Sequence, residues 1–288
     1  MAGSEFRTRA LLTPALLIAI GAVYWLDSSA ALGCRPGTLS AAVLGLLGIA
    51  GLREYIALLR GASFAVARVP LLAAGSALHA AALMFGWSRV DRELYPPVSI
   101  TMLLLCYLAV RSLGRESMRT SLELQGSSLL GFLFVSWSMY LGQGICFRHL
   151  PSVLFVVLVC KSGDIGGYLA GSQFGGRKLI PHVSPGKTVK GALGSLAFSV
   201  VMAFALRPLL LAPAVELGPL STAAVGVMLN FTTQAGDLIE SLLKRRCGAK
   251  DSASLLPAHG GVLDLVDSIL FSLSAWFLIL IWLTGAPD

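Results

Sequence analysis

The chain has few charged residues for its length. Of its 288 residues, only 13% are Asp, Glu, Lys or Arg, whereas 56% are hydrophobic. Soluble domains usually contain about 25% charged residues, so this composition excludes an ordinary soluble domain. We therefore expect an all-α, polytopic integral membrane protein.

Cysteine and histidine are also scarce, and their spacing fits neither a disulfide framework nor a zinc site. The five cysteines form no Cys-x-x-Cys pair, and the four histidines lack metal-ligand spacing. The formal net charge of +7 could indicate a nucleic-acid partner, but the cations lie in short loops beside apolar runs. Anionic lipid headgroups and membrane topology explain cations there better. We expect membrane lipids as partners and no nucleic acid.

Long apolar runs are abundant. A run of about 17 to 25 residues can cross a bilayer as a helix, and no alternating strand pattern competes with this interpretation. We count nine candidate spans, at residues 10–26, 38–55, 69–87, 96–112, 127–147, 150–174, 191–212, 217–239 and 263–284. The first six residues, MAGSEF, resemble an expression-vector remnant, so we expect the native chain to begin near Arg7.

Lysine and arginine are distributed unevenly around these spans. With a cytoplasmic N-terminus, 16 of the 22 fall in cytoplasmic segments and five outside, with Lys161 inside a span. The positive-inside rule predicts such a bias. We expect the N-terminus and the active site on the cytoplasmic side of a bacterial inner (plasma) membrane. Residues 7–126 would be helices for packing, and residues 127–288 would be the catalytic domain, since polar motifs accumulate after Lys161.

Carboxylates gather at two predicted helix ends near the C-terminus. Positions 237, 240, 241 and 244 recur at helical spacing and share one face, which carries Asp237, Glu240, Ser241 and Lys244. Asp264 and Asp267 begin the next helix, after a Pro257–Gly261 turn. Charged side chains at membrane depth are costly and normally face a partner or a water-filled cavity.

One interpretation of these groups is a structural salt-bridge cluster with Lys244 and Arg245, but the carboxylates outnumber what such a cluster needs. Oxygen ligands without histidine or cysteine suit Mg²⁺, which takes one or two carboxylates and completes its shell with water and substrate phosphates. We predict a magnesium and phosphate site, and leave open a second cation such as K⁺. The predicted metal ligands are Asp237, Glu240, Asp264 and Asp267.

The segment SPGKTVKG, residues 184–191, superficially resembles a P-loop. A Walker A motif would need glycine five residues before Gly186, where this chain has Pro181, and we expect no strand before it. The alternatives are a loop that binds phosphates through Ser184, Lys187 and Thr188 near a helix N-terminus, or an ordinary loop beside lipid headgroups.

A third polar motif lies inside an apolar span. Lys161 and Asp164 are three residues apart, so they could neutralise each other or line an active cavity. Glycines at 163, 166, 167 and 171 would let neighbouring helices approach closely.

These motifs together resemble the CTP-dependent phosphatidate cytidylyltransferases, also called CDP-diacylglycerol synthases. The resemblance rests on a gapped pattern that this chain matches in spacing throughout. It comprises Ser241, Lys244-Arg245, Lys250-Asp251, Pro257-Ala258-His259-Gly260-Gly261 and Asp264-Leu265-Val266-Asp267. Asp164 and the segment from Ser184 to Thr188 extend the similarity through the C-terminal half.

The resemblance implies transfer of CMP from CTP to phosphatidic acid, giving CDP-diacylglycerol and pyrophosphate with Mg²⁺ as cofactor. It implies catalytic roles for Asp237, Lys244, Asp264 and Asp267. It implies substrate contacts by Asp164, Ser184, Lys187, Thr188, Ser241, Arg245, Lys250, Asp251, His259, Gly260 and Gly261. A polar cavity open to the cytoplasm and to lipid would admit both substrates. A homodimer paired through N-terminal helices is a further expectation.

Three positions depart from the family pattern. The family usually has arginine where this chain has Leu265, glutamate where it has Lys190, and lysine where it has Gly186. These changes keep open a related lipid cytidylyltransferase or a weakly active homologue. An ion-coupled transporter that uses Lys161, Asp164 and Asp237 is a further alternative, although no inverted repeat is evident.

Overall fold

Long helices make up most of the fold. The structure is a computed structural model that describes residues 18–29, 33–85, 90–114, 117–253 and 260–284, except for the side chains of residues 90–94. Within these ranges, seven helices are long and apolar enough to cross a membrane. The prediction of a helical, polytopic integral membrane protein is therefore confirmed.

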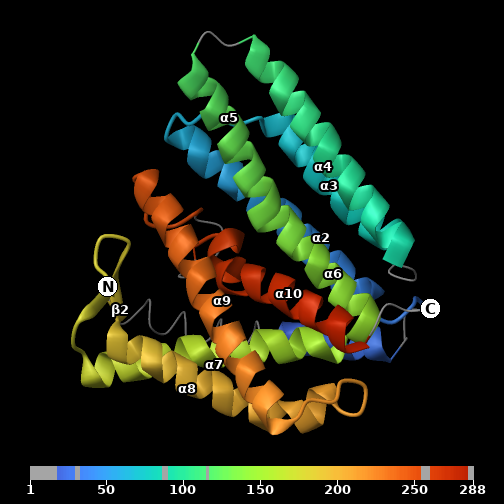
Figure 1. Cartoon of the computed structure of the whole chain (residues 1–288), viewed down its shortest axis with the longest axis vertical. Helices are drawn as coiled ribbons and strands as arrows, with labels where there is room; N and C mark the ends of the chain where they lie inside the picture. The colour runs from blue at the N-terminus through green and yellow to red at the C-terminus, as the bar shows by residue number, and fades with distance from the viewer. Residues whose placement is uncertain (1–17, 30–32, 86–89, 115–116, 254–259, 285–288) are drawn as a thin grey trace. The chain divides into compact units, whose positions relative to one another are not determined.

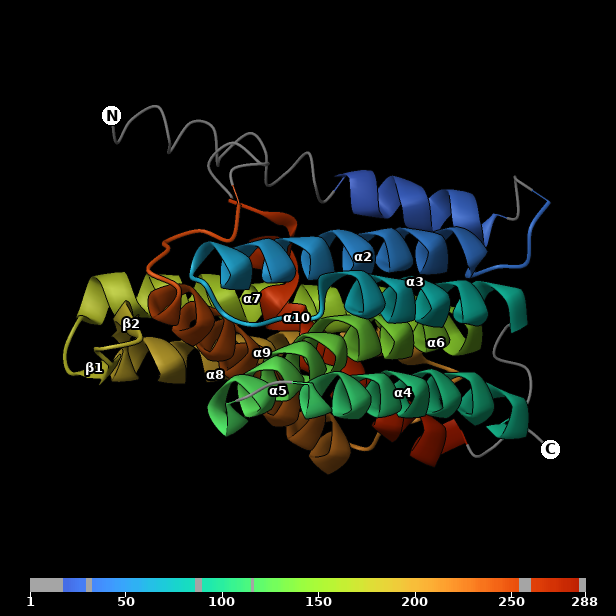
Figure 2. The same cartoon turned by 90° about the horizontal axis from the view of Figure 1, so that it is seen from above.

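The chain divides into two compact units, residues 1–150 with 247–266 and residues 151–246 with 267–288. The first unit contains a short apolar helix, Ile18–Ser28, and several longer elements. These are α2 (Thr38–Gly61), α3 (Arg68–Phe85), α4 (Val90–Leu113), α5 (Met118–Gly131), the π-helical segment η1 (Phe132–Trp137) and α6 (Ser138–His149). Figures 1 and 2 show α2 to α6 running alongside one another.

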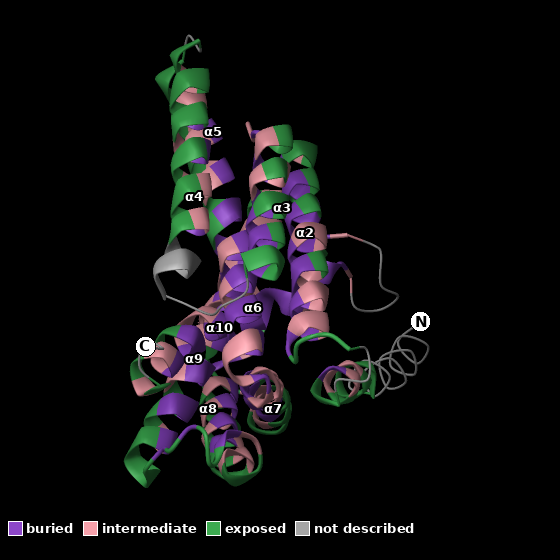
Figure 3. Cartoon of the chain, turned by 90° about the vertical axis from the view of Figure 1, so that its right-hand side faces the viewer, coloured by how far each residue is buried: buried purple, intermediate pink, exposed green. Residues whose placement is uncertain are grey.

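The core of the first unit lies along α2. Leu52, Tyr55 and Leu59 recur at helical spacing and are 0%, 0% and 4% exposed. The Tyr55 hydroxyl donates a hydrogen bond to the Ser127 carbonyl at 2.8 Å, which ties α2 to α5. By contrast, α4 leaves a large part of its surface exposed (Figure 3). Apolar side chains on such a face suit contact with lipid, which is as apolar as leucine.

The second unit is built from helices and a small sheet. Its elements are α7 (Pro151–Phe174), β1 (Lys178–Ile180), β2 (Ser184–Thr188), α8 (Val189–Leu206), the π-helical segment η2 (Arg207–Leu211), α9 (Pro219–Arg246) and most of α10 (Val262–Thr284). The boundary between the units falls within α10, after Val266. Figures 1 and 2 show α7 beside α8.

The expected close approach of glycine-rich helices is confirmed for α7 and α8. A Cβ atom on Gly166 would lie 2.4 Å from the Phe198 ring. Glycine therefore provides the space for this aromatic side chain.

The prediction that no strand occurs near residues 178–188 was wrong. Strands β1 and β2 form an antiparallel hairpin with Lys178 opposite Thr188 and Ile180 opposite Ser184. Strands of three and five residues are too short to show a clear alternating pattern in the sequence. The hairpin places Thr188 at the N-terminus of α8.

The nine predicted spans compare with the seven candidate helices as follows. Seven expected spans each coincide with one of these helices, although α5 to α6 form a helix of 32 residues that begins earlier than expected. Of the expected span 10–26, residues 18–26 lie in the short apolar helix Ile18–Ser28, and residues 10–17 lie outside the described residues. The expected span 217–239 is helical, within α9, but polar side chains such as Asn230 and Gln234 reduce its hydropathy. The count of nine stays a prediction.

Candidate metal and phosphate site

Helices α9 and α10 come very close at Gly236. A Cβ atom at this position would lie 2.3 Å from the carbonyl oxygen of Asp267, so any larger residue would collide with backbone. Gly236 and Asp267 both belong to the second unit, and Gly236 directly precedes Asp237 in the sequence. Gly236 thereby sets the distance between the carboxylates of the two helices.

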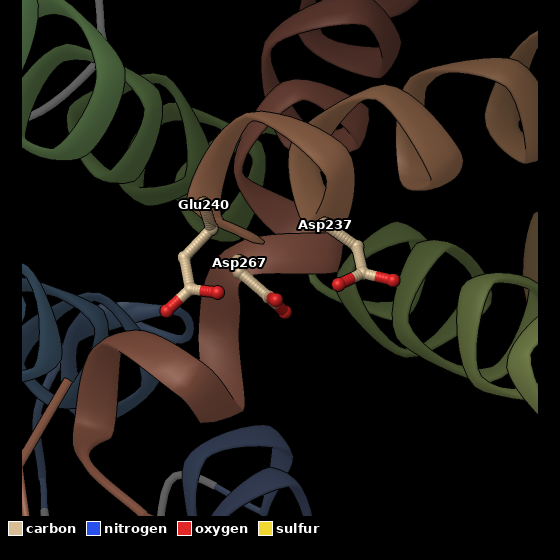
Figure 4. A group of neighbouring side chains, drawn as sticks. All are labelled: Asp237, Glu240 and Asp267. Atoms are coloured by element: carbon tan, nitrogen blue, oxygen red, sulfur yellow. The ribbon is translucent and has the colours of Figure 1, made fainter. Parts of the chain in front are cut away.

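Three carboxylates gather at this contact. One oxygen from each of Asp237, Glu240 and Asp267 lies within 4.8 Å of the others. Figure 4 shows Asp237 and Glu240 extending from α9, with the Asp267 side chain of α10 between them. Glu240 is 0% exposed and Asp267 is 7% exposed, so water can compensate little of their charge. Such a group needs cations nearby.

Two lysines supply part of that positive charge. Lys187 of β2 forms an ion pair with Asp237, and Lys244 forms one with Glu240 from the next turn of α9. Asp267 has no ion pair within 4 Å among the described residues. The salt-bridge interpretation thus accounts for two of the three carboxylates and leaves one in surplus.

The surplus carboxylate and the oxygen-only ligand set fit Mg²⁺. Mg²⁺ prefers carboxylate, phosphate and water oxygens over nitrogen or sulfur ligands. Three of the four predicted metal ligands are therefore grouped in one place. Asp264 belongs to the first unit, and its role as a ligand stays a prediction.

Lys161 and Asp164 also lie in the second unit. The Lys161 ammonium is 3.4 Å from Asp164 Oδ2 and donates to the Ser268 hydroxyl at 2.8 Å. The two residues thus form the ion pair that was one of the two alternatives, and a role for Asp164 in an active cavity stays a prediction. Since Ser268 follows Asp267, Lys161 also reaches the helix that carries the carboxylate in surplus.

In the first unit, Asp264 stabilises the start of α10. Its Oδ2 atom accepts hydrogen bonds from the Gly261 amide at 2.7 Å, the Ser252 amide at 2.8 Å and the Ser252 hydroxyl at 2.7 Å. Gly260 before it has φ +81°, which glycine adopts without strain. The signature Gly-Gly thus forms the turn that precedes the Asp264 helix.

Glu54 is a buried carboxylate that the sequence analysis missed. It is 9% exposed in the middle of α2, and it accepts hydrogen bonds from the amides of Val262 and Leu263 at 2.9 and 2.8 Å. The Ser252 hydroxyl lies 3.0 Å from its Oε2. These amides are the first of α10, so Glu54 caps a helix about 200 residues away in sequence. The available signal was an acidic residue inside an apolar run.

The other predicted substrate contacts are distributed over both units. Thr188 caps α8 by accepting a hydrogen bond from the Gly191 amide at 3.0 Å, and the Ser241 hydroxyl is 3.4 Å from Asp237 Oδ1. Ser184 begins β2, and Arg245 is exposed at the end of α9. Lys250 and Asp251 are exposed in the first unit. His259 lies outside the described residues.

Lys190, one of the three positions that depart from the family pattern, has a local structural role. Its ammonium donates to the carbonyl of Phe174 at 3.3 Å, at the C-terminus of α7. A cation is favourable there because the last helical carbonyls lack helical donors. Nothing in the structure explains the glycine at 186.

Comparison with known proteins gives curated relatives. The chain is 38% identical over 125 residues to "Uncharacterized protein YnbB" of Escherichia coli (strain K12), covering 43% of this chain and 41% of that protein. It is 42% identical over 134 residues to the phosphatidate cytidylyltransferase of Pseudomonas aeruginosa, covering 46% and 48%. It is 36% identical over 155 residues to that of Bacillus subtilis (strain 168), covering 49% and 55%. The chain thus spans about half the length of the curated relatives it matches.

A family match extends much further along the chain. The sequence model described as "Cytidylyltransferase family" matches residues 10–283. This range includes the cluster of Asp237, Glu240 and Asp267 and the turn before Asp264. The chain therefore belongs to the cytidylyltransferase family.

Proposed function

We propose that the protein transfers CMP from CTP to phosphatidic acid, producing CDP-diacylglycerol and pyrophosphate. The observation that carries the proposal is the group of Asp237, Glu240 and Asp267, whose oxygens lie within 4.8 Å of one another. Family membership supports the cytidylyl donor. Curated relatives named phosphatidate cytidylyltransferase support the lipid acceptor.

In this reaction, an oxygen of the phosphatidate phosphate attacks the α-phosphorus of CTP. The bond from that phosphorus to the β-phosphate oxygen breaks, and pyrophosphate leaves. The attacking phosphate monoester is already ionised near neutral pH, with its second pKa near 6, so the chain needs no dedicated general base. Positioning and charge neutralisation then supply most of the catalysis.

The acidic residues would hold Mg²⁺. Asp237, Glu240 and Asp267 would be its protein ligands, and Asp264 is a further predicted ligand. When bound, Mg²⁺ neutralises phosphate charge and polarises the phosphorus–oxygen bonds. A second cation such as K⁺ would bind in addition to Mg²⁺ and would not replace it.

The basic residues would bind phosphate oxygens. Lys187 and Lys244 already lie beside the carboxylates, in ion pairs with Asp237 and Glu240. Arg245 and the Ser241 hydroxyl occupy the same end of α9. A triphosphate could accept hydrogen bonds from these donors while the carboxylates turn to the metal ion. Lys250, Asp251 and His259 would complete the substrate contacts that the signature predicts.

The location follows from the chemistry of the two substrates. CTP is soluble and phosphatidic acid is a bilayer lipid, so the reaction requires a polar cavity open to the cytoplasm and sideways to lipid. We place it at the cytoplasmic face of a bacterial inner membrane because of the lysine and arginine bias. Pairing into a homodimer is compatible with this location.

A direct assay tests the proposal. Purified full-length protein is incubated with CTP radiolabelled in the cytosine ring, phosphatidic acid and Mg²⁺, and the label is followed into the chloroform phase. We expect a chloroform-soluble cytidine product that disappears with EDTA and returns with added Mg²⁺. No such product under any Mg²⁺ concentration would contradict the proposal. A product with another lipid phosphate but not phosphatidic acid would redirect it to a related cytidylyltransferase.

A further inference from the structure

A cavity in the first unit has a basic lining that the proposed reaction does not use. Its volume is about 510 Å³, and it lies against α2, the beginning of α3 and the first residue of α10. Arg53, Arg60 and Arg68 line it. We infer that this cavity binds a phosphate ester at the membrane surface.

The arginines are arranged to act together. Arg53 and Arg60 are seven residues apart on α2, so they share one face about 10 Å apart along the helix. Arg68 is the first residue of α3, beyond the short 62–67 connection. All three are exposed. A planar guanidinium presents a fork of N–H donors that matches two phosphate oxygens.

The arginines lack an acidic partner in the part of the chain that the structure describes. Within that part, none of the three forms an ion pair within 4 Å. Glu54 also lines the cavity, but its carboxylate accepts the amide hydrogens of Val262 and Leu263. Three arginines and one glutamate give the lining a formal charge of +2. A positive lining of this kind favours the binding of an anion.

The position favours an anion attached to a lipid. Arg60 and Arg68 flank a connection between two candidate membrane spans, Thr38–Gly61 and Arg68–Phe85, so they lie near a membrane surface on whichever side it faces. Ala50, Ala57 and Leu72 give the cavity an apolar wall. A phospholipid presents a phosphate beside apolar chains, whereas free phosphate offers nothing to that wall.

Lipid retention provides the test. Full-length protein is reconstituted in phosphatidylcholine nanodiscs that contain phosphatidylglycerol, released, and analysed by native mass spectrometry. Arg60→Gln combined with Arg68→Gln should lower retained phosphatidylglycerol by about tenfold or more, because each basic residue contributes to headgroup attraction. Arg111→Gln combined with Arg119→Gln is the matched control. It removes two exposed arginines of the same unit that do not line the cavity.

A competition arm separates the two sources of phosphate. Displacement of the lipid by glycerol 3-phosphate or inorganic phosphate would assign the cavity to a soluble phosphate ester, and no displacement would assign it to the lipid headgroup. Equal retention by the wild type and both double variants, or equal loss from both variants, would overturn the inference. The assay contains no CTP, so its result is independent of the proposed reaction.

A conservative substitution provides a second test in case the double variant does not fold stably. If the double variant is unstable, Arg60→Lys keeps the charge but loses the planar fork. It should reduce phosphatidylglycerol retention partially while leaving the melting temperature unchanged. Full retention in this variant, together with full retention in Arg68→Lys, would also overturn the inference.

Discussion

The two compact units both carry carboxylates on their helices, but the surroundings of these carboxylates differ. In the first unit, Glu54 and Asp264 each lie within hydrogen-bonding distance of three donors. These are backbone amides at or just before the start of α10, together with the amide and the hydroxyl of Ser252. In the second unit, Asp237, Glu240 and Asp267 direct their oxygens toward one another and toward two lysines.

The difference shows that neighbouring donors decide what a buried carboxylate does. Backbone amides at a helix N-terminus satisfy a carboxylate and hold the chain in place. Carboxylates that face one another repel, and they are stable together only with cations. The hydrogen bonds of Glu54 and Asp264 therefore stabilise the structure, and Asp264 keeps its predicted role as a ligand besides. The three grouped carboxylates suit the metal ion that we propose.

Asp237→Asn should have the largest effect on activity. The change removes a charged ligand from the group of three but keeps the side-chain shape. Loss of several kcal/mol of charge stabilisation in the transition state corresponds to a fall in kcat on the order of 10³-fold or more. The measurement is single-turnover formation of labelled CDP-diacylglycerol. The melting temperature should stay within a few degrees of the wild type, because removing one of three like charges relieves repulsion.

Asp264→Asn sharpens the comparison between the units. Its Oδ2 accepts three hydrogen bonds, so this variant should lose thermal stability as well as activity. Equal melting temperatures for Asp237→Asn and Asp264→Asn would remove the distinction between the two sets of carboxylates. Near-normal activity in Asp237→Asn would remove the metal assignment.

Gly236→Ala should have the next largest effect. The new methyl group would meet the Asp267 carbonyl oxygen at 2.3 Å, so α9 and α10 must separate. Overpacking of this kind costs about 1–3 kcal/mol, and separation of the grouped carboxylates should lower kcat/KM by about 10- to 100-fold. Activity and melting temperature are measured together. Gly126→Ala is the control, since nothing lies within 4 Å of its added Cβ atom.

Lys187→Ala should have a smaller effect, mainly on substrate affinity. The ammonium pairs with Asp237 and the side chain is 26% exposed, so Lys187 can contact a phosphate oxygen. We expect the KM for CTP to rise by about 5- to 10-fold with a smaller change in kcat. Lys178→Ala on the paired strand is the control, because Lys178 is exposed and has no ion pair among the described residues. Equal KM values for both variants would contradict the assignment.

Much of the site could be predicted from the sequence because helical spacing relates its residues locally. Asp237, Glu240 and Lys244 lie three or four residues apart on α9, so one helix places them on one face. Seven of the expected spans also coincide with helices, since long apolar runs have few alternatives in lipid.

The remainder depends on contacts between residues distant in sequence. Nothing near Glu54 in the sequence indicates that it caps a helix starting at Val262. Nor does the sequence near Lys187 show that a hairpin brings it to Asp237, because strands of three and five residues have too little periodicity. The sequence likewise does not show that Asp264 accepts hydrogen bonds from Ser252, 12 residues before it.

Glu54→Gln should have the smallest effect on activity and a clear effect on stability. The amide keeps one acceptor oxygen, but its NH₂ group would face the amide hydrogens of Val262 or Leu263 or the Ser252 hydroxyl. Loss of a buried, charge-assisted hydrogen bond costs about 1–3 kcal/mol, so the melting temperature should fall by several degrees while kcat/KM changes only a few-fold. The exposed Glu216→Gln should change neither quantity. If Glu54→Gln instead lowered activity as much as Asp237→Asn at an unchanged melting temperature, Glu54 would be assigned to the metal ligands. The metal ligands would then come from three helices rather than two, and the contrast between the units would no longer hold.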